Sequence, residues 1–246
     1  MPEHSLVGIL GGMGPAATAA FYNHLVASTP ATRDQDHLKV VMWADPTVPD
    51  RTAALLGDGE SIVPWLERGV RALRASGAHV IVCPCNTAHV WLGEVVRKHG
   101  LDLLSIVDAT IEEARAAAPG GHPIGILATE ATLSAGLYQD GLAERGLTAI
   151  LPEPQQQARL IEAIYRVKAG TEADLRRAAA TVAQVCRELV AAGAGTIMSA
   201  CTELSLVLQD VDPTVRVIDS TDALVQAVVR RYGPVATAAP GPGSTR

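Results

Sequence analysis

Short apolar runs alternate with amphipathic stretches along most of the chain. Runs of strand length occur at 6–10, 39–44, 79–83 and 103–107, and again at 123–127, 148–151, 196–199 and 215–218. The stretches between them have helical spacing, as in 61–76, where Ile62, Leu66, Val70 and Leu73 share one face. Strands that alternate with helices of about 10–15 residues predict an α/β fold with parallel sheets.

The helical stretches and one strong break divide the chain. We expect helices at 16–28, 61–76, 88–99, 109–118, 133–145, 155–169, 172–192 and 221–231. The clearest break is Pro119-Gly120-Gly121, which ends a first module at residue 118. The prediction assigns 119–212 to a second module and returns 213–232 to the first. It leaves 233–246, rich in Pro, Ala and Gly, as a disordered tail.

The two halves repeat one another around two cysteines. In each half a helix-like run ends at a glycine, an apolar run follows, and a cysteine stands eight residues past the glycine: Cys85 after Gly77, and Cys201 after Gly193. The matching upstream segments are Gly8-Ile9-Leu10 and Gly125-Ile126-Leu127, which precede these cysteines by 77 and 76 residues. This displacement predicts two similar modules, which we interpret as Rossmann-like and related by pseudo-two-fold symmetry. If the modules face each other, two thiols approach one pocket from opposite sides.

The amino-acid composition argues against some classes of binding partner. The 246 residues are 48% hydrophobic but only 3% aromatic, and the net charge of −6 argues against nucleic acid or an anionic membrane as partner. Four cysteines do not make a disulfide framework, no apolar run reaches 18 residues, and the start lacks a basic leader. We therefore expect a cytoplasmic protein with free thiols.

The matched cysteines are the strongest catalytic candidates. Cys85 and Cys201 each follow a predicted strand and precede a predicted helix, and Asn86 and Thr87 are residue types that cap helices. A helix N-terminus favours a thiolate and receives a carboxylate. Either thiol could instead be a small buried hydrophobe, but packing does not demand cysteine at both equivalent strand ends.

The other two cysteines fit the core better. Cys83-Pro84-Cys85 could be a metal or redox pair, but zinc sites usually have wider spacing and further Cys or His ligands. Cys186 lies in an apolar helix. We expect both Cys83 and Cys186 to be buried, and we expect no metal site.

A glycine-rich turn follows the first strand. Gly12-x-Gly14-x-x-Ala17 is a variant of the dinucleotide fingerprint, but it lacks a well-placed acidic residue for the ribose. We favour a turn that lets Met13 and backbone N–H groups approach a small ligand.

Several polar side chains follow other strands. Arg51 could grip a carboxylate bidentately or be a solvated surface arginine, while Thr129 and Thr132 could donate hydrogen bonds to a ligand. His89 and Glu203 stand near the cysteines and could tune a thiol, although His89 could equally serve local packing.

Four motifs in order are similar to those of the aspartate/glutamate racemase superfamily, and most of all to its PLP-independent aspartate racemases. These motifs are Gly11-Gly12-Met13-Gly14-Pro15, Pro49-Asp50-Arg51-Thr52, Pro84-Cys85-Asn86-Thr87-Ala88-His89 and Cys201-Thr202-Glu203. The resemblance spans about residues 6–231. It implies two similar α/β modules, an active site in the cleft between them, and commonly a homodimer.

The resemblance also assigns roles to residues. It implies that Cys85 and Cys201 are the catalytic pair, and that Arg51 and Lys168 bind the distal carboxylate of the substrate. The α-carboxylate is implied to bind Asn86, Thr87 and Thr202. The chain departs from the common pattern at Cys83, often aliphatic in relatives, and at Ala200, often glycine. Because Ala200 borders the second thiol, this departure bears on substrate range.

The expected reaction is a cofactor-independent interconversion of L- and D-aspartate, extending to glutamate, in which one cysteine removes the α-proton and the other returns one. Two alternatives stay open. The chain could be another isomerase or a decarboxylase of the same superfamily acting on a dicarboxylic acid. It could also be a metabolite- or nucleotide-binding module without catalysis.

Overall fold

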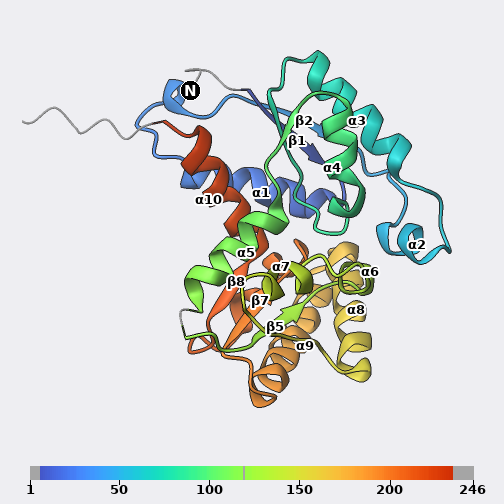
Figure 1. Ribbon diagram of the computed structural model, residues 1–246, viewed down its shortest axis with the longest axis vertical. Coiled ribbons are helices and arrows are strands. Elements are labelled where there is room, and N and C mark those ends of the chain that lie inside the picture. The colour runs from blue at the N-terminus through green and yellow to red at the C-terminus, as the bar shows by residue number, and fades with distance from the viewer. Residues whose placement is uncertain (1–5, 119, 235–246) are drawn as a thin grey trace, which may run out of the picture.

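The computed structural model describes residues 6–118 and 120–234, and it contains two four-stranded parallel sheets (Figure 1). The first has the order β2-β1-β3-β4, made of Val40–Ala44, Val7–Gly11, Val80–Val82 and Asp102–Leu103. The second has the order β6-β5-β7-β8, made of Ala149–Ile150, Ile124–Leu127, Thr196–Ser199 and Val217–Asp219. The same strand order in both halves confirms the predicted α/β fold with parallel sheets.

Ten α-helices and three 3-10 turns connect these strands in the described ranges. The helices are α1 (Pro15–Ser28), α2 (Arg51–Leu56), α3 (Val63–Ala75), α4 (His89–Lys98), α5 (Ile106–Ala117), α6 (Glu130–Ser134), α7 (Gln139–Ala143), α8 (Pro154–Ala169), α9 (Glu172–Ala191) and α10 (Ser220–Tyr232). The 3-10 turns are η1 (Asp34–Asp36), η2 (Leu204–Leu206) and η3 (Leu208–Asp210).

Three apolar cores hold these elements together. One outer core packs α3 and α4 on the first sheet, and another packs α8 and α9 on the second. A central core joins the inner faces of both sheets with α1, α5, α7 and α10. Because side chains alternate across a strand, Ile9 and Ile126 face the central core, while Leu10 and Leu127 face the two outer cores.

The repeat seen in the sequence has a packing reason at its glycines. A Cβ at Gly8 would lie 2.9 Å from the Cβ of Ala78, and one at Gly125 would lie 3.2 Å from the Cβ of Ala194. In both halves, therefore, the central strand passes so close to the turn before the next strand that a side chain would clash.

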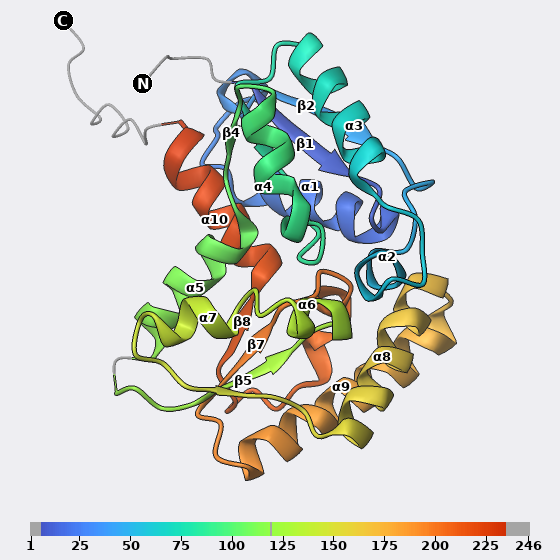
Figure 2. The same ribbon diagram turned by 45° about the vertical axis from the view of Figure 1, so that its right-hand side comes forward.

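The last helix of each half packs on the other half. Helix α5 follows β4 of the first sheet but contacts α7 and β8, whereas α10 follows β8 of the second sheet but contacts α1 (Figure 2). The prediction that 213–232 returns to the first module is therefore wrong for its strand, because β8 pairs with β7 in the second sheet. The division into modules otherwise stays a prediction, and tail residues 235–246 lie outside the described residues.

Two predicted elements need correction, and one helix was missed. The apolar run 103–107 is not one strand, because Ser105 accepts a hydrogen bond from the Asp108 N–H and starts α5 at Ile106. The expected helix at 133–145 is split into α6 and α7 around Gly136, whose φ of 65° is left-handed. Helix α2 was not expected at all, and Asp50 caps it.

No helix among the described residues is long and apolar enough to cross a membrane.

Candidate active site

A cavity of about 310 Å³ lies where the loops after the strands of both sheets meet. Its lining comes from both halves: Met13, Asp50, Arg51, Thr52, Cys85, Asn86 and Thr87 from the first, and Thr129, Lys168, Ala200, Cys201, Thr202 and Glu203 from the second. Of the site residues expected from the sequence, only Thr132 and His89 do not line it. The two matched cysteines therefore share one cavity.

Cys85 is held by the backbone around it. Its N–H donates to the Cys83 carbonyl over 2.8 Å, and its own carbonyl lies 2.9 Å from His89 Nδ1. His89 Nε2 accepts from the Ile106 N–H over 3.3 Å, so Nδ1 carries the proton and donates to Cys85. Burial lowers the pKa of His89 to about 4 and keeps the ring neutral. His89 thus positions the Cys85 backbone and makes no hydrogen bond to the thiol.

The expected helix caps are not formed. Helix α4 has Ala88 as its N-cap, so Asn86 and Thr87 lie in the turn before it. Cys201 precedes a 3-10 turn, η2, in place of the expected α-helix. Helix N-termini are therefore not the main influence on these thiols, and burial instead raises the pKa of both Cys85 and Cys201.

The two thiols differ in their charged neighbours. At Cys85, burial raises the pKa and Glu203 adds to this, but the Arg51 guanidinium, the Ala88 N–H and Lys168 oppose it. At Cys201, burial raises the pKa well above its usual value and the Glu203 carboxyl adds to it, because Cys201 Sγ donates to Glu203 Oε2 over 3.2 Å. The Arg51 side chain is itself fixed by the Val48 and Pro49 carbonyls, at 3.3 and 3.1 Å.

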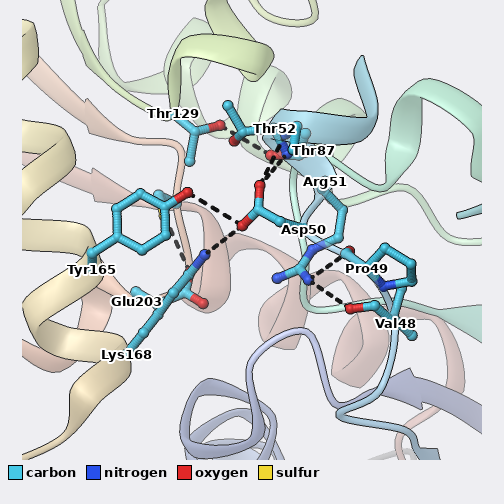
Figure 3. A network of polar contacts seen from close by, with 12 residues as sticks. Val48, Pro49, Asp50, Arg51, Thr52, Thr87, Thr129, Tyr165, Lys168 and Glu203 are labelled. Carbon is cyan, nitrogen blue, oxygen red and sulfur yellow. Dashed lines mark hydrogen bonds and ion pairs between the residues drawn. The ribbon is translucent and has the colours of Figure 1, made fainter. Parts of the chain in front are cut away.

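Asp50 links the two halves through its carboxylate (Figure 3). Oδ1 caps α2 by accepting from the N–H groups of Thr52 and Ala53, at 2.8 and 3.0 Å. Oδ2 accepts from the Tyr165 hydroxyl at 3.2 Å and lies 3.9 Å from Lys168 Nζ on α8. Burial alone would raise the pKa of Asp50, but these N–H groups and the neighbouring cations outweigh it and lower the pKa. Lys168 therefore reaches the cavity next to an anion.

Three threonine hydroxyls form a ring across the two halves. Thr87 Oγ1 lies 3.0 Å from Thr129 Oγ1 and 2.9 Å from Thr132 Oγ1, and these last two are 3.0 Å apart. Each hydroxyl has one proton to donate, so three contacts use all three protons. A ligand that accepts a hydrogen bond here must therefore replace one of the three hydroxyls as the acceptor.

Asn86 and Thr202 also bond across the halves. Asn86 Nδ2 donates to Ser220 Oγ over 3.1 Å, its Oδ1 accepts from the Tyr138 hydroxyl, and Thr202 Oγ1 donates to the Pro84 carbonyl over 3.1 Å. Sequence reasoning missed Tyr138 and Ser220, which lie 52 and 134 residues from Asn86 and carry no local motif. The side chains of Asn86 and Thr202 are thus already engaged before any carboxylate binds.

The glycine-rich turn packs against protein. A Cβ at Gly12 would lie 2.4 Å from the Asp45 backbone N, so this glycine lets β2 and the turn approach closely. A Cβ at Gly14 would lie 3.3 Å from Glu203 Oε1. Beside this turn a second cavity of about 640 Å³ shares Asp50, Arg51, Lys168 and Glu203 with the first; its other lining residues are Gly12, Gly14, Pro15, Ala16, Ala17, Pro46, Val167 and Leu206.

The remaining cysteines are buried, as expected. Cys83 lies in the core under α3 and α4, and Cys186 lies on the buried face of α9, where burial raises its pKa to about 11. Within 6–118 and 120–234, no group of three or more His, Cys, Asp or Glu side chains could hold a metal ion.

Comparisons with known proteins agree with this architecture. The chain is 29% identical over 236 residues to the broad specificity amino-acid racemase RacX of Bacillus subtilis, covering 92% of this chain and 98% of the relative. The aspartate racemase of Picrophilus torridus superposes with a TM-score of 0.80 at 32% identity, covering 92% of this chain and 93% of that one.

The fold extends to more distant proteins. The glutamate racemase RacE1 of Bacillus anthracis superposes with a TM-score of 0.68 at 17% identity, covering 95% of this chain and 85% of that one. A family model described as Asp/Glu/hydantoin racemase matches residues 10–228. With most of its length matched, the chain belongs to the Asp/Glu/hydantoin racemase family.

Proposed function

We propose that the protein is a cofactor-independent amino-acid racemase that interconverts L- and D-aspartate through Cys85 and Cys201. The observation that carries the proposal is that two thiols, one from each half, line a single cavity. An α-proton must leave one face of the α-carbon and a proton must return to the other, so one base on each face is required.

The two thiols would work in opposite protonation states. One thiolate takes the α-proton and becomes a thiol, while the electron pair of the broken C–H bond moves into the carboxylate to give an enediolate. The opposite thiol then protonates the other face and becomes the thiolate. Arg51 favours the thiolate of Cys85, whereas Cys201 donates to a carboxylate and is held as the thiol. The resting enzyme is therefore poised with Cys85 as the base.

Hydrogen-bond donors would stabilise the enediolate. Each preorganised donor aimed at developing negative charge is worth about 3–4 kcal/mol elsewhere. The α-carboxylate would accept a hydrogen bond from the Thr87 or Thr129 hydroxyl and lie against Asn86 and Thr202. In the low-dielectric cavity these contacts strengthen as charge moves onto the carboxylate oxygens.

Aspartate is the proposed substrate because two cations line the same cavity. Arg51 and Lys168 come from different halves, and a distal carboxylate between them would compete with Asp50 for Lys168. Glutamate is expected to react more slowly, because its extra methylene displaces the distal carboxylate. The similar proteins differ in the substrate range that their names give: the protein of Picrophilus torridus is an aspartate racemase, whereas RacX is a broad specificity amino-acid racemase. Met13 and Ala200 would then limit substrate size.

The cofactor requirement, location, oligomeric state and partners of the protein are also proposed. We propose that the enzyme uses neither PLP nor a metal, acts in the cytoplasm as a homodimer, and binds neither nucleic acid nor membranes. The acidic net charge of −6 supports the last point.

Incubation of the protein with single L- and D-amino acids in deuterated water tests the proposal. Chiral chromatography should show both enantiomers arising from aspartate, with deuterium at the α-carbon of the product. Unchanged activity after exposure to a chelator, and no absorbance of a PLP Schiff base, are expected. Release of carbon dioxide, or solvent deuterium absent from every amino acid, would contradict the racemase assignment.

A further inference from the structure

The carboxyl of Glu203 stands out among the polar groups of the cavity. The side chain is only 6% exposed, and Oε2 accepts from Cys201 Sγ over 3.2 Å. Within the ranges that the structure describes, Oε1 is buried and has no hydrogen-bond partner. Burying a carboxylate oxygen without a hydrogen-bond partner costs free energy. A ligand that donates a hydrogen bond to this oxygen removes that cost and binds more tightly.

Glu203 stands where the two cavities meet. Glu203 lines both the 310 Å³ cavity with the two cysteines and the 640 Å³ cavity beside α1. The side chain points to Gly14, where a Cβ would stand 3.3 Å from Oε1. Because residue 14 is a glycine, no side chain at that position packs against Oε1.

A second carboxylate, Asp50, lines the first cavity, but its oxygens are already occupied. Oδ1 accepts from two backbone N–H groups, and Oδ2 accepts from Tyr165 and faces Lys168. An α-amino acid carries a positive ammonium group, which needs an anionic acceptor when it leaves water. Of the two lining carboxylates, only Glu203 has an oxygen left for it.

We propose that Glu203 Oε1 binds the α-ammonium group of the amino-acid substrate. This inference rests on the proposed racemase function and adds the group that recognises the amine. One oxygen of Glu203 would hold the ammonium while the other accepts from Cys201, so the same carboxylate would place the α-carbon next to that thiol. The site would then select α-amino acids over acids of the same size that lack the amine.

Paired ligands that differ only in the amine test this role. Calorimetry would compare aspartate with succinate, and alanine with propionate, on the wild type and on Glu203→Gln, which keeps the shape but loses the charge. We expect the wild type to bind each amino acid more tightly than its partner. Glu203→Gln should weaken amino-acid binding by about 10–100-fold, the range for a hydrogen bond to a charged group, and change succinate and propionate by less than about threefold.

A second variant of Glu203 and a control variant at another glutamate complete the experiment. Glu203→Asp keeps the charge but withdraws it by one methylene, so it should also lose amino acids selectively; it serves if Glu203→Gln does not fold. The exposed Glu130→Gln, at the start of α6, is the matched control and should bind all four ligands as the wild type does. Equal loss of both members of a pair, or no preference for amino acids in the wild type, would overturn the role of Glu203.

Racemisation by the same wild-type preparation is measured in parallel. An active enzyme whose Glu203 variants keep the wild-type preference for amino acids, or lose both members of a pair equally, would refute this inference alone. An inactive wild type would refute the proposed function, whatever the binding data show.

Discussion

The loop after β3 and the loop after β7 place their cysteines at the same distance from a glycine, yet they surround the two thiols differently. Cys85 is faced by Arg51, and its backbone carbonyl is held by His89 at the start of α4. Cys201 donates to Glu203 and precedes a 3-10 turn. The repeat thus fixes where two thiols stand, while the residues around them give each thiol its own charge preference.

This difference teaches that structural symmetry need not give chemical symmetry. Two thiols in identical surroundings would have the same pKa. The resting enzyme would then be an even mixture of the form ionised at one thiol and the form ionised at the other. A cation beside one thiol and a carboxylate beside the other instead favour a single protonation state. The following experiments test that comparison.

Removing either thiol should have the largest effect. Cys85→Ser and Cys201→Ser should each lower kcat/KM for racemisation by roughly three orders of magnitude or more, because each removes one of two obligatory proton carriers. Exchange of the α-proton with deuterated solvent, followed by mass spectrometry, should survive on opposite enantiomers in the two variants. Cys83→Ala is the matched control and should keep most of the activity. Full racemisation by either serine variant would exclude the two-thiol mechanism.

Removing the cation should come next. Arg51→Ala should raise the barrier for aspartate by about 2–4 kcal/mol, the range for losing one partner of a desolvated charge pair. The measurement is kcat/KM on aspartate and on alanine, and the ratio between them should fall in the variant. Arg71→Ala, an exposed arginine on α3, should change neither rate. A ratio unaffected by Arg51→Ala would rule out the distal carboxylate contact and leave only a role at Cys85.

The histidine that holds Cys85 should make stability depend on pH. The pKa of His89 falls from its usual 6.5 to about 4 on folding, so the unfolded chain binds more protons between these values. The stability that this neutral ring contributes should be intact above about pH 6.5 and be lost as the pH falls toward 4. Because residue 89 as a whole keeps some exposure to solvent, we expect a loss on the order of 2 kcal/mol.

Urea denaturation at pH 7 and pH 4.5 measures this effect as the difference between wild type and His89→Gln. His24→Gln, at an exposed histidine that pairs with Asp222, is the control. If His89→Gln and the wild type lose stability equally on acidification, the neutral ring is not what couples folding to pH at this loop.

The last prediction concerns how the rate depends on pH above neutrality. Burial raises the pKa of Cys85, so only a fraction of the enzyme carries the thiolate at pH 7. The value of kcat/KM should increase about tenfold per pH unit from neutrality until Cys85 is ionised. Initial rates from pH 6 to pH 10 in both directions of reaction would locate this rise, and a rate that stays constant across the range would contradict a buried thiol as the base.

Local patterns in the sequence predicted much of the scaffold. Short apolar runs located the central strands, such as 196–199, and the eight-residue offset predicted that Cys85 and Cys201 would be equivalent. The run 103–107 misled because Ser105 divides it between a strand and a helix. Helix α2 was missed because its six residues are too few to show a helical period.

The electrostatics of the site could not be predicted in the same way. Burial, and not the start of a helix, dominates the pKa of both thiols, and burial depends on residues from both halves. The partners of Asn86 lie 52 and 134 residues away in the chain, so no local window contains them. The Pro49-Asp50-Arg51-Thr52 motif included Asp50, but its contact with Lys168 required the fold.

The exchange of α5 and α10 has a mechanical consequence. Each half extends one helical arm onto its neighbour, and both arms end in the shared central core. Cleavage of the chain near residue 120 would leave two fragments, each with its last helix still packed against the other fragment. Neither fragment could keep the central core intact after separation, because that core is built from helices of both pieces. The two halves that line the cavity are thus held together from both sides.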